Sequence, residues 1–333
     1  PRNQAAFEEA RPVMENGVNA LKALCSFKPF LCGNFSLADI MAAHTFIYAQ
    51  PVAQAIYGWD LVAAVPPLAG QAIETETIAR LDSCDMDHAT WSALAARSAF
   101  HLARPEVAGI VVTHGTDTLE ETAYFLHRTV AAVKPVVLTA AMRPATALSP
   151  DGPQNLFDAV CLARVSGAQG VLAVLGGQLI GAEDLRKVHG YRVDAFDAGD
   201  AGALGRLADG ELQSFRSWPA VDGSAAALLA QPPAQWPRVG IVLSHAGVDA
   251  TLLDAAVAAG LQGVVVAGTG NGTVHAQLLA AAQRAQAAGV TVWRSSRCWL
   301  GGVVGAEGPL PSAGPLTPVQ ARVALMLALM PRG

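Results

Sequence analysis

A threonine next to an aspartate is the residue pair in this 333-residue chain best placed to do chemistry. Thr116 and Asp117 follow an apolar run, Ile110 to Val112, which is typical of a strand buried on both faces. Helical spacing begins shortly afterwards, so the pair is predicted to lie on a strand-to-helix turn. Because ligands of open α/β sheets bind at the carboxyl ends of strands, a hydroxyl beside a carboxylate at this turn indicates a site for a small polar molecule.

The start of the following helix is predicted at Thr118. Thr118 and Glu121 have the spacing of a capping box, in which each side chain accepts a hydrogen bond from the backbone N–H of the other residue. The alternative interpretation is that Thr116 and Asp117 only cap this helix, which is the commoner role of an isolated Thr-Asp pair. The residues around the pair decide between the two interpretations.

Composition indicates a compact soluble α/β protein with more than one domain. The chain is 52% hydrophobic and 15% charged, with a net charge of −5. It has no basic patch for nucleic acid and no apolar run long enough to span a membrane. Its cysteines show no metal-ligand or disulfide spacing, so we expect reduced thiols in the cytoplasm. They are Cys25, Cys32, Cys84, Cys161 and Cys298.

The stretch from Thr113 to Leu126, Thr-His-Gly-Thr-Asp-Thr-Leu-Glu-Glu-Thr-Ala-Tyr-Phe-Leu, resembles the second active-site signature of the bacterial L-asparaginase family. The resemblance covers about residues 61–333. It implies a two-domain α/β fold with mostly parallel sheets flanked by helices. It also implies cofactor-free hydrolysis of L-asparagine, or of glutamine, to the acid and ammonia by a homotetramer, a dimer of dimers, with no nucleic-acid or membrane partner.

The same resemblance assigns roles to particular residues. Thr116 would attack the substrate or activate the nucleophile, and Asp117 would bind its α-amino group. Lys187, in Glu-Asp-Leu-Arg-Lys-Val-His, matches the family's catalytic lysine and would act as the base. Asp-Ser-Cys-Asp-Met resembles the substrate-binding loop, so Ser83 would contact the α-carboxylate. Cys84 stands where a glutamine or lysine is more usual, which would alter specificity.

Other motifs give further expectations. Asn271, in Gly-Thr-Gly-Asn-Gly-Thr, is expected near the active site across a subunit interface, by the same resemblance. Its glycines do not have the G-x-G-x-x-G spacing of a dinucleotide site, and the histidines show no metal-ligand spacing. Arg143 and Asp151 are predicted to form a structural ion pair beneath the site. Buried strands are predicted at residues 134–139, 170–175, 238–243, 263–267 and 290–293, and helices at 252–259 and 274–288.

The first 58 residues differ from the rest of the chain. Phe30 to Asp39, Phe-Leu-Cys-Gly-Asn-Phe-Ser-Leu-Ala-Asp, resembles the helical carboxyl-terminal domain of glutathione transferases over about residues 1–55. Helices are predicted at residues 12–24 and 36–50, the second capped by Ser36. The asparaginase family's opening strand and Thr-Gly-Gly-Thr-Ile motif, which bears its first nucleophile, do not occur in residues 1–58. We therefore expect weak asparagine hydrolysis or none.

The predicted organisation is a hybrid of two families joined near Tyr57. It has a helical segment at 1–58, a truncated amino-terminal asparaginase-like domain at 59–205, a linker at 206–237 and a carboxyl-terminal domain at 238–333. Three alternatives to an active enzyme remain. They are a catalytically impaired amino-acid-binding homologue, a tRNA-dependent amidotransferase subunit, against which the acidic balance argues, and a helical interaction module formed by residues 1–58.

Overall fold

The computed structural model describes residues 65–68, 70–145, 147–305 and 307–331. The helices predicted for residues 12–24 and 36–50 lie outside the described residues, as does the whole glutathione-transferase-like segment. Residues Gly70–Pro144 and Ser149–Gly333 belong to one compact unit, and the described part of that unit contains every element discussed below except the 3-10 turn at Pro66–Leu68.

A six-stranded mixed sheet forms the first layer of this unit, in the order β1-β2-β3-β4-β7-β8. Strands β1, β2 and β3 run parallel, and the three later strands add to the sheet antiparallel. Every residue of β2 and β3 is buried, as expected for continuous apolar runs between two layers of helices. The strands are β1 (Ile110–Thr113), β2 (Val136–Thr139), β3 (Val171–Leu175), β4 (Gln178–Gly181), β7 (Gly205–Ala208) and β8 (Glu211–Ser214).

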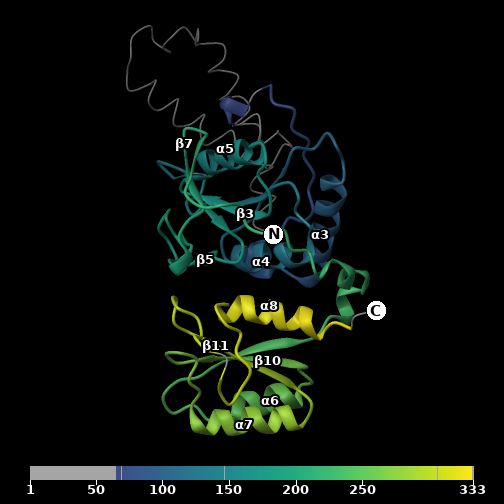
Figure 1. Ribbon diagram of the computed structural model, residues 1–333, viewed down its shortest axis with the longest axis vertical. Helices are drawn as coiled ribbons and strands as arrows, with labels where there is room; N and C mark the ends of the chain where they lie inside the picture. Colours follow the sequence, from purple (N-terminus) through teal and green to yellow (C-terminus); the bar gives the residue numbers. More distant parts are fainter. Residues whose placement is uncertain (1–64, 69, 146, 306, 332–333) are drawn as a thin grey trace, which may run out of the picture. The chain divides into compact units, whose positions relative to one another are not determined.

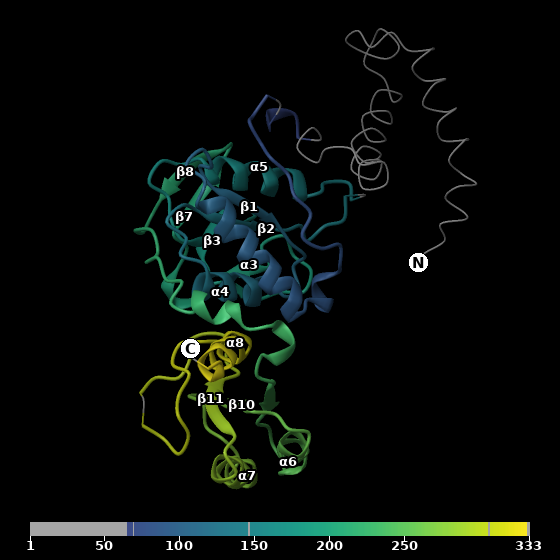
Figure 2. The same ribbon diagram turned by 90° about the vertical axis from the view of Figure 1, so that its right-hand side faces the viewer.

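Helices cover both faces of this sheet (Figures 1 and 2). Helices α3 (His88–Leu102) and α4 (Leu119–Thr129) pack on one face, and α5 (Gly152–Ala163) packs on the other. Alternate strand residues divide between the faces, so that Val136 and Leu138 join α4 whereas Val137 joins α5. The predicted fold class, parallel strands flanked by helices, is confirmed.

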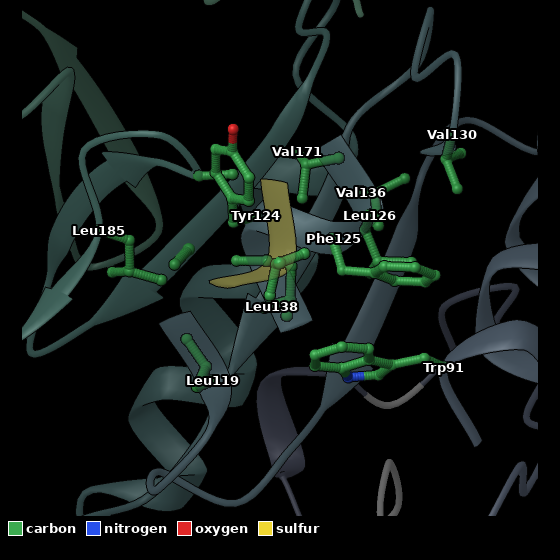
Figure 3. Packing of buried hydrophobic residues seen from close by; sticks show 14 of the residues in the cluster. Trp91, Leu119, Tyr124, Phe125, Leu126, Val130, Val136, Leu138, Val171 and Leu185 are labelled. Atoms are coloured by element: carbon green, nitrogen blue, oxygen red, sulfur yellow. The ribbon is translucent and has the colours of Figure 1, made fainter. Parts of the chain in front are cut away.

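Aromatic side chains from α3 and α4 fill the core beneath the sheet, as Figure 3 shows. The Trp91 ring stacks on Phe125 with centroids 4.8 Å apart and planes 13° apart. Its Nε1–H donates to Thr122 Oγ1 at 2.9 Å, so the buried indole leaves no polar atom unpaired. This packing fixes α4, and with it the turn that precedes α4.

The carboxyl-terminal half forms a smaller layer on a three-stranded parallel sheet, in the order β11-β10-β9. Helices α6 and α7 share a core with one face of this sheet, and α8 packs on the other. The predicted strands and helices of this half are confirmed, whereas α8 was not predicted. The elements are β9 (Val239–Leu243), α6 (Thr251–Ala258), β10 (Gly263–Gly268), α7 (Ala276–Ala287), β11 (Thr291–Ser296) and α8 (Pro318–Leu329).

Helix α8 is shared by two cores. Leu325 packs with Val265 of the three-stranded sheet, whereas Val323 and Met326 join the core formed with α3 and α4. Because both sides of α8 are covered by apolar contacts, its sequence lacks the one-sided periodicity that predicts a surface helix. Among the described residues, no helix combines the length and the apolar character needed to cross a bilayer.

Short elements complete the described chain. Two strands of two residues each, β5 (Arg186–Lys187) and β6 (Phe196–Asp197), pair antiparallel and lie between β4 and β7 in the sequence. The 3-10 turns are η1 (Pro66–Leu68), η2 (Ser83–Asp85), η3 (Gly199–Ala201), η4 (Ala226–Ala230) and η5 (Pro233–Gln235).

Two expectations about the first sheet differ from the structure. In the described part of the chain β1 pairs only with β2, and its residues are partly buried rather than buried on both faces. Strands β7 and β8 belong to this sheet, although residues 206–214 were expected in a linker. Both strands are short and partly exposed, so their sequences lack the continuous apolar run that predicts a buried strand.

Candidate active site

Lys187 brings together the hydroxyl and the carboxylate that the sequence placed side by side. Its Nζ donates to Thr116 Oγ1 at 3.0 Å and to Asp117 Oδ1 at 2.6 Å. The lysine side chain is 15% exposed and the aspartate side chain 55% exposed. The amine is therefore largely enclosed, while the carboxylate remains open to a ligand. Two segments about 70 residues apart in sequence meet at this point.

The Thr116 turn is built at the carboxyl end of β1. His114 extends the ladder by donating its N–H to Thr139 O at 2.9 Å, and α4 begins at Leu119. A Cβ atom on Gly115 would lie 2.5 Å from Ser83 Oγ, so only glycine allows the two loops to approach this closely.

Ser83 locks the turn from the neighbouring loop. Its Oγ accepts from the Asp117 N–H at 3.0 Å, and its carbonyl accepts from Thr118 Oγ1 at 2.7 Å. Thr118 does occupy the N-cap position, but its side chain makes no cap hydrogen bond, so the predicted capping box is wrong. The physical reason is that the Thr118 hydroxyl is directed to the Ser83 carbonyl, and that the Glu121 carboxylate pairs with Arg322 at 2.9 Å.

The two loop residues predicted to bind substrate differ in exposure. Ser83 is 2% exposed and serves the backbone of the turn, whereas Cys84 is exposed beside it. Reduced hydration raises the pKa of the Cys84 thiol, and the nearby carboxylates of Asp82, Asp85 and Asp117 raise it further. The thiol therefore stays protonated at neutral pH, which makes it a poor nucleophile and leaves it as a neutral group at the edge of the site.

Glu120 is a second carboxyl group close to the lysine. Burial, and to a lesser degree the charge of Glu121, raises its pKa from 4.5 to about 7. A hydrogen bond from the Lys187 backbone N–H and the charges of Arg186 and Lys187 oppose this rise. A carboxyl group that titrates near neutral pH thus lies next to the segment that carries Lys187. It was not identified from the sequence.

His114 supports the turn from inside. Its Nε2 lies 3.0 Å from Thr122 Oγ1, and its Nδ1 lies 2.6 Å from Gly115 O. Since Thr122 Oγ1 already accepts from Trp91, its hydroxyl proton is free to go to Nε2, which leaves Nδ1–H to bind the Gly115 carbonyl. Burial lowers the pKa of His114, so the ring is neutral in this arrangement.

Asn155 organises the neighbouring strand ends and was also missed. Its Nδ2 donates to Ala140 O at 2.8 Å, and its Oδ1 accepts from the Gly176 N–H at 3.0 Å. It therefore ties the loop after β2 to the turn after β3. The available signal in the sequence was that Asn155 follows Asp151 by four residues, one turn of a helix. In the structure its Nδ2 also donates to Asp151 Oδ2 at 3.2 Å.

The ion pair predicted between Arg143 and Asp151 does not form. Asp151 accepts instead from the backbone N–H groups of Met142 and Arg143, each at 2.9 Å, and the Arg143 guanidinium donates to Ser149 O. The carboxylate shapes this loop through its backbone, since two N–H groups that face it provide better geometry than a flexible exposed side chain.

Asn271 makes none of these hydrogen bonds and holds another loop. Its Nδ2 donates to Val304 O at 2.9 Å, and its Oδ1 accepts from the Val304 N–H at 2.7 Å. Its expected position at a subunit interface stays a prediction. Among the described residues, no three His, Cys, Asp or Glu side chains are arranged to hold a metal ion.

Comparison with known proteins defines the class to which this fold and site belong. Residues 46–220 match the family description "Asparaginase, N-terminal", and residues 238–331 match "Glutaminase/Asparaginase C-terminal domain". Residues 4–70 match "Glutathione S-transferase, C-terminal domain", which confirms the resemblance found in the first segment. The chain belongs to the asparaginase family.

Several individual proteins are similar over most of the chain. "Probable L-asparaginase periplasmic" of Haemophilus influenzae is 38% identical, covering 81% of this chain and 79% of its own. "L-asparaginase 2" of Bacillus subtilis is 39% identical, covering 81% and 74% respectively. The crystal structure of the "Probable Cytoplasmic L-asparaginase" from Campylobacter jejuni superposes with a TM-score of 0.75 at 36% identity, covering 82% of this chain and 86% of that one.

Proposed function

We propose that this protein is an L-asparaginase-type amidohydrolase that converts L-asparagine, and glutamine as a second substrate, to the acid and ammonia. The observation that carries the proposal is the position of Lys187 Nζ, 3.0 Å from Thr116 Oγ1 and 2.6 Å from Asp117 Oδ1. A hydroxyl, an amine and a carboxylate in mutual contact form the arrangement that activates a nucleophile. The names of the relatives indicate the substrate.

In the proposed mechanism the Thr116 hydroxyl turns to donate to the Lys187 amine, and Thr116 Oγ1 attacks the carbon of the side-chain amide. The Lys187 amine accepts the hydroxyl proton and passes it to the amide nitrogen, which leaves as ammonia. Water then hydrolyses the Thr116 ester and releases the acid. Asp117 keeps the lysine in place and, being exposed, binds the α-amino group of the substrate. The amino end of α4 directs its positive dipole toward this turn, which favours the negative charge that develops during attack.

Recognition of the substrate would depend on the loop around η2. Ser83 holds the Asp117 backbone and directs its own hydroxyl proton to the α-carboxylate. Cys84 lies exposed beside it, so its small neutral side chain would set the space for the substrate's amide arm. A Cys84→Gln variant would shift the ratio of asparagine to glutamine turnover, whereas a Cys161→Ser control, distant in sequence, would not.

We further propose a homotetrameric, cytoplasmic enzyme with the domain plan 1–58, 59–214, 215–237 and 238–333, in which β7 and β8 belong to the second part. Free thiols at Cys84, Cys161 and Cys298 support a reducing compartment. The relatives differ in this respect, one being named periplasmic and another cytoplasmic. Light scattering on the purified protein and fractionation of the source cells would test assembly and location.

The second candidate function is an amino-acid-binding protein with very slow turnover. Its support is that β1, whose carboxyl end carries the site, pairs with β2 on one side only in the described part of the chain. The family's Thr-Gly-Gly-Thr-Ile motif is also absent from the printed sequence. Such a protein would bind aspartate in a calorimeter without releasing ammonia from asparagine.

The deciding experiment measures ammonia release by purified full-length protein. The substrates are L-asparagine, L-glutamine and succinamic acid, which lacks the α-amino group. The Thr116→Val variant removes the reacting hydroxyl, and Thr251→Val on α6 is the matched control. We expect slow hydrolysis of asparagine that is lost in Thr116→Val, retained in Thr251→Val, and much weaker with succinamic acid. Equal rates for all three proteins would disprove the assignment of Thr116.

A further inference from the structure

One buried amide of α8 contacts the segment that carries Lys187. Gln320 is fully buried, and its Nε2 donates to Glu183 O at 3.1 Å and to Leu185 O at 3.3 Å. These carbonyls lie 137 and 135 residues earlier in the chain. Among the described residues no other side chain binds them. Gln320 therefore links the carboxyl-terminal half of the chain to the backbone before Lys187. The Arg186 guanidinium, next to Lys187, makes a second link to this half by donating to Trp299 O and Pro315 O.

The backbone of the segment before Lys187 makes few other hydrogen bonds, although the Leu185 side chain is buried in the core and Asp184 pairs with Arg216 at 3.3 Å. The N–H groups of Asp184 and Leu185 both turn back to Gly181 O, at 3.0 and 3.1 Å. Strand β5 is only two residues long and pairs with β6 alone. A buried carbonyl without a donor costs about 1–3 kcal/mol, so loss of the Gln320 amide would favour a shift of this segment.

Helix α8 also fixes the opposite side of the site. Two residues after Gln320, the Arg322 guanidinium binds Glu121 at 2.9 Å and lies 5.6 Å from the centre of the Trp91 ring. Glu121 is in the first turn of α4, directly after the Thr116 turn. The amino-terminal turns of α8 thus contact both segments whose separation sets the distance from Lys187 Nζ to Thr116 Oγ1.

We propose that Gln320 is a positioning residue for Lys187, acting through the carbonyls of Glu183 and Leu185. The inference deepens the proposed amidohydrolase function and rests on it. A 1 Å displacement of a catalytic group lowers a rate by roughly 100-fold, so small shifts of this segment have large effects on turnover.

The simpler interpretation is that Gln320 only caps α8. Gln320 and Thr317 form a capping box, in which Gln320 Oε1 accepts from the Thr317 N–H at 3.1 Å and Thr317 Oγ1 accepts from the Gln320 N–H at 3.3 Å. A cap uses the oxygen of the glutamine amide and does not require its nitrogen. The two interpretations therefore predict different effects for variants at the two positions.

The test compares Gln320→Met with Thr317→Ala in the full-length protein. Gln320→Met keeps the side-chain length but loses the donor to both carbonyls, together with the acceptor for the Thr317 N–H. Thr317→Ala weakens the cap by about 1 kcal/mol and leaves the Gln320 amide in place. Gln320→Asn, whose shorter amide cannot reach both carbonyls, is the second variant if the methionine does not fold.

Two readouts are measured, and one of them does not depend on activity. The first is kcat and KM for asparagine. The second is the rate at which an amine-specific reagent labels Lys187, read by peptide mass spectrometry relative to Lys134. The chain contains only four lysines, at positions 22, 28, 134 and 187, so the labelled peptides are simple to assign.

For Gln320→Met we expect kcat to fall roughly 10- to 100-fold with little change in KM, and Lys187 to be labelled several-fold faster. Gln320→Asn should change both quantities in the same direction, and Thr317→Ala should match the wild type in both. Equal effects of Gln320→Met and Thr317→Ala, or unchanged labelling in Gln320→Met, would overturn the proposal. If the wild type releases no ammonia, the proposed function fails, and the labelling rates still decide the role of Gln320.

Discussion

Glu120 makes the stability of this protein depend on pH in a direction opposite to that of most carboxylates. Its ordinary pKa is 4.5, and burial beside Glu121 raises its pKa to about 7 in the folded protein. Each unit of difference between the folded and unfolded pKa values corresponds to about 1.4 kcal/mol. The free energy of unfolding is therefore lower by roughly 3 kcal/mol once this carboxyl group ionises.

The direction follows from the protons bound in each state. Below pH 4.5 Glu120 is protonated in both the folded and the unfolded chain, so it adds no pH dependence. Between pH 4.5 and about 7 the unfolded chain loses the proton while the folded chain retains it, so the free energy of unfolding falls as pH rises. Above about pH 7 the penalty is complete.

Glu120→Gln should remove this penalty. The amide oxygen still accepts from the Lys187 N–H, and no charge has to be buried. Urea unfolding is expected to show a gain of roughly 3 kcal/mol over the wild type at about pH 8 and almost none at about pH 4. Glu211→Gln, at an exposed position on β8, is the matched control. A gain of the same size at both pH values would refute the reasoning, because it would not depend on ionisation.

Three other substitutions separate packing, loop order and binding. Trp91→Ala should lower the free energy of unfolding by about 3–5 kcal/mol in urea titrations, because a 3% exposed ring stacked on Phe125 is lost; a smaller change would show that the cavity collapses. Asn155→Leu should lower it by about 2 kcal/mol or more, since the Gly176 N–H and the Ala140 carbonyl lose their partner; unchanged stability would contradict this role. Asp117→Ala should weaken aspartate binding about tenfold or more in calorimetry with little loss of stability, because its lysine pair is half exposed; unchanged affinity would remove Asp117 from recognition.

The elements nearest the site were predictable because their sequences obey simple rules. Strand β2 is a continuous apolar run between helices, and α4 has Leu119, Ala123 and Leu126 at helical spacing. The resemblance to the asparaginase family added Lys187, which lies about 70 residues from Thr116 and has no local pattern that reveals its partner. That contact is a property of the fold and not of any one segment.

What the sequence did not reveal depends on contacts between distant residues. Helix α8 is apolar on more than one side because two cores share it, so its periodicity is weak. The capping box at Thr118 does not form because the Thr118 hydroxyl donates to the carbonyl of Ser83, 35 residues earlier. Glu120 and His114 owe their shifted pKa values to burial, which the one-dimensional pattern does not report.

The central claim is that Lys187 activates the Thr116 hydroxyl for attack on an amino-acid amide. The most direct measurement is ammonia release from L-asparagine by the wild type, by Lys187→Met and by Lys134→Met, the control for a lysine whose amine donates to the Arg104 carbonyl. The account predicts a loss of about 100-fold or more for Lys187→Met, with its stability nearly unchanged because the Asp117 carboxylate that loses its partner is 55% exposed, and no loss for Lys134→Met. Equal rates for the two variants would contradict it.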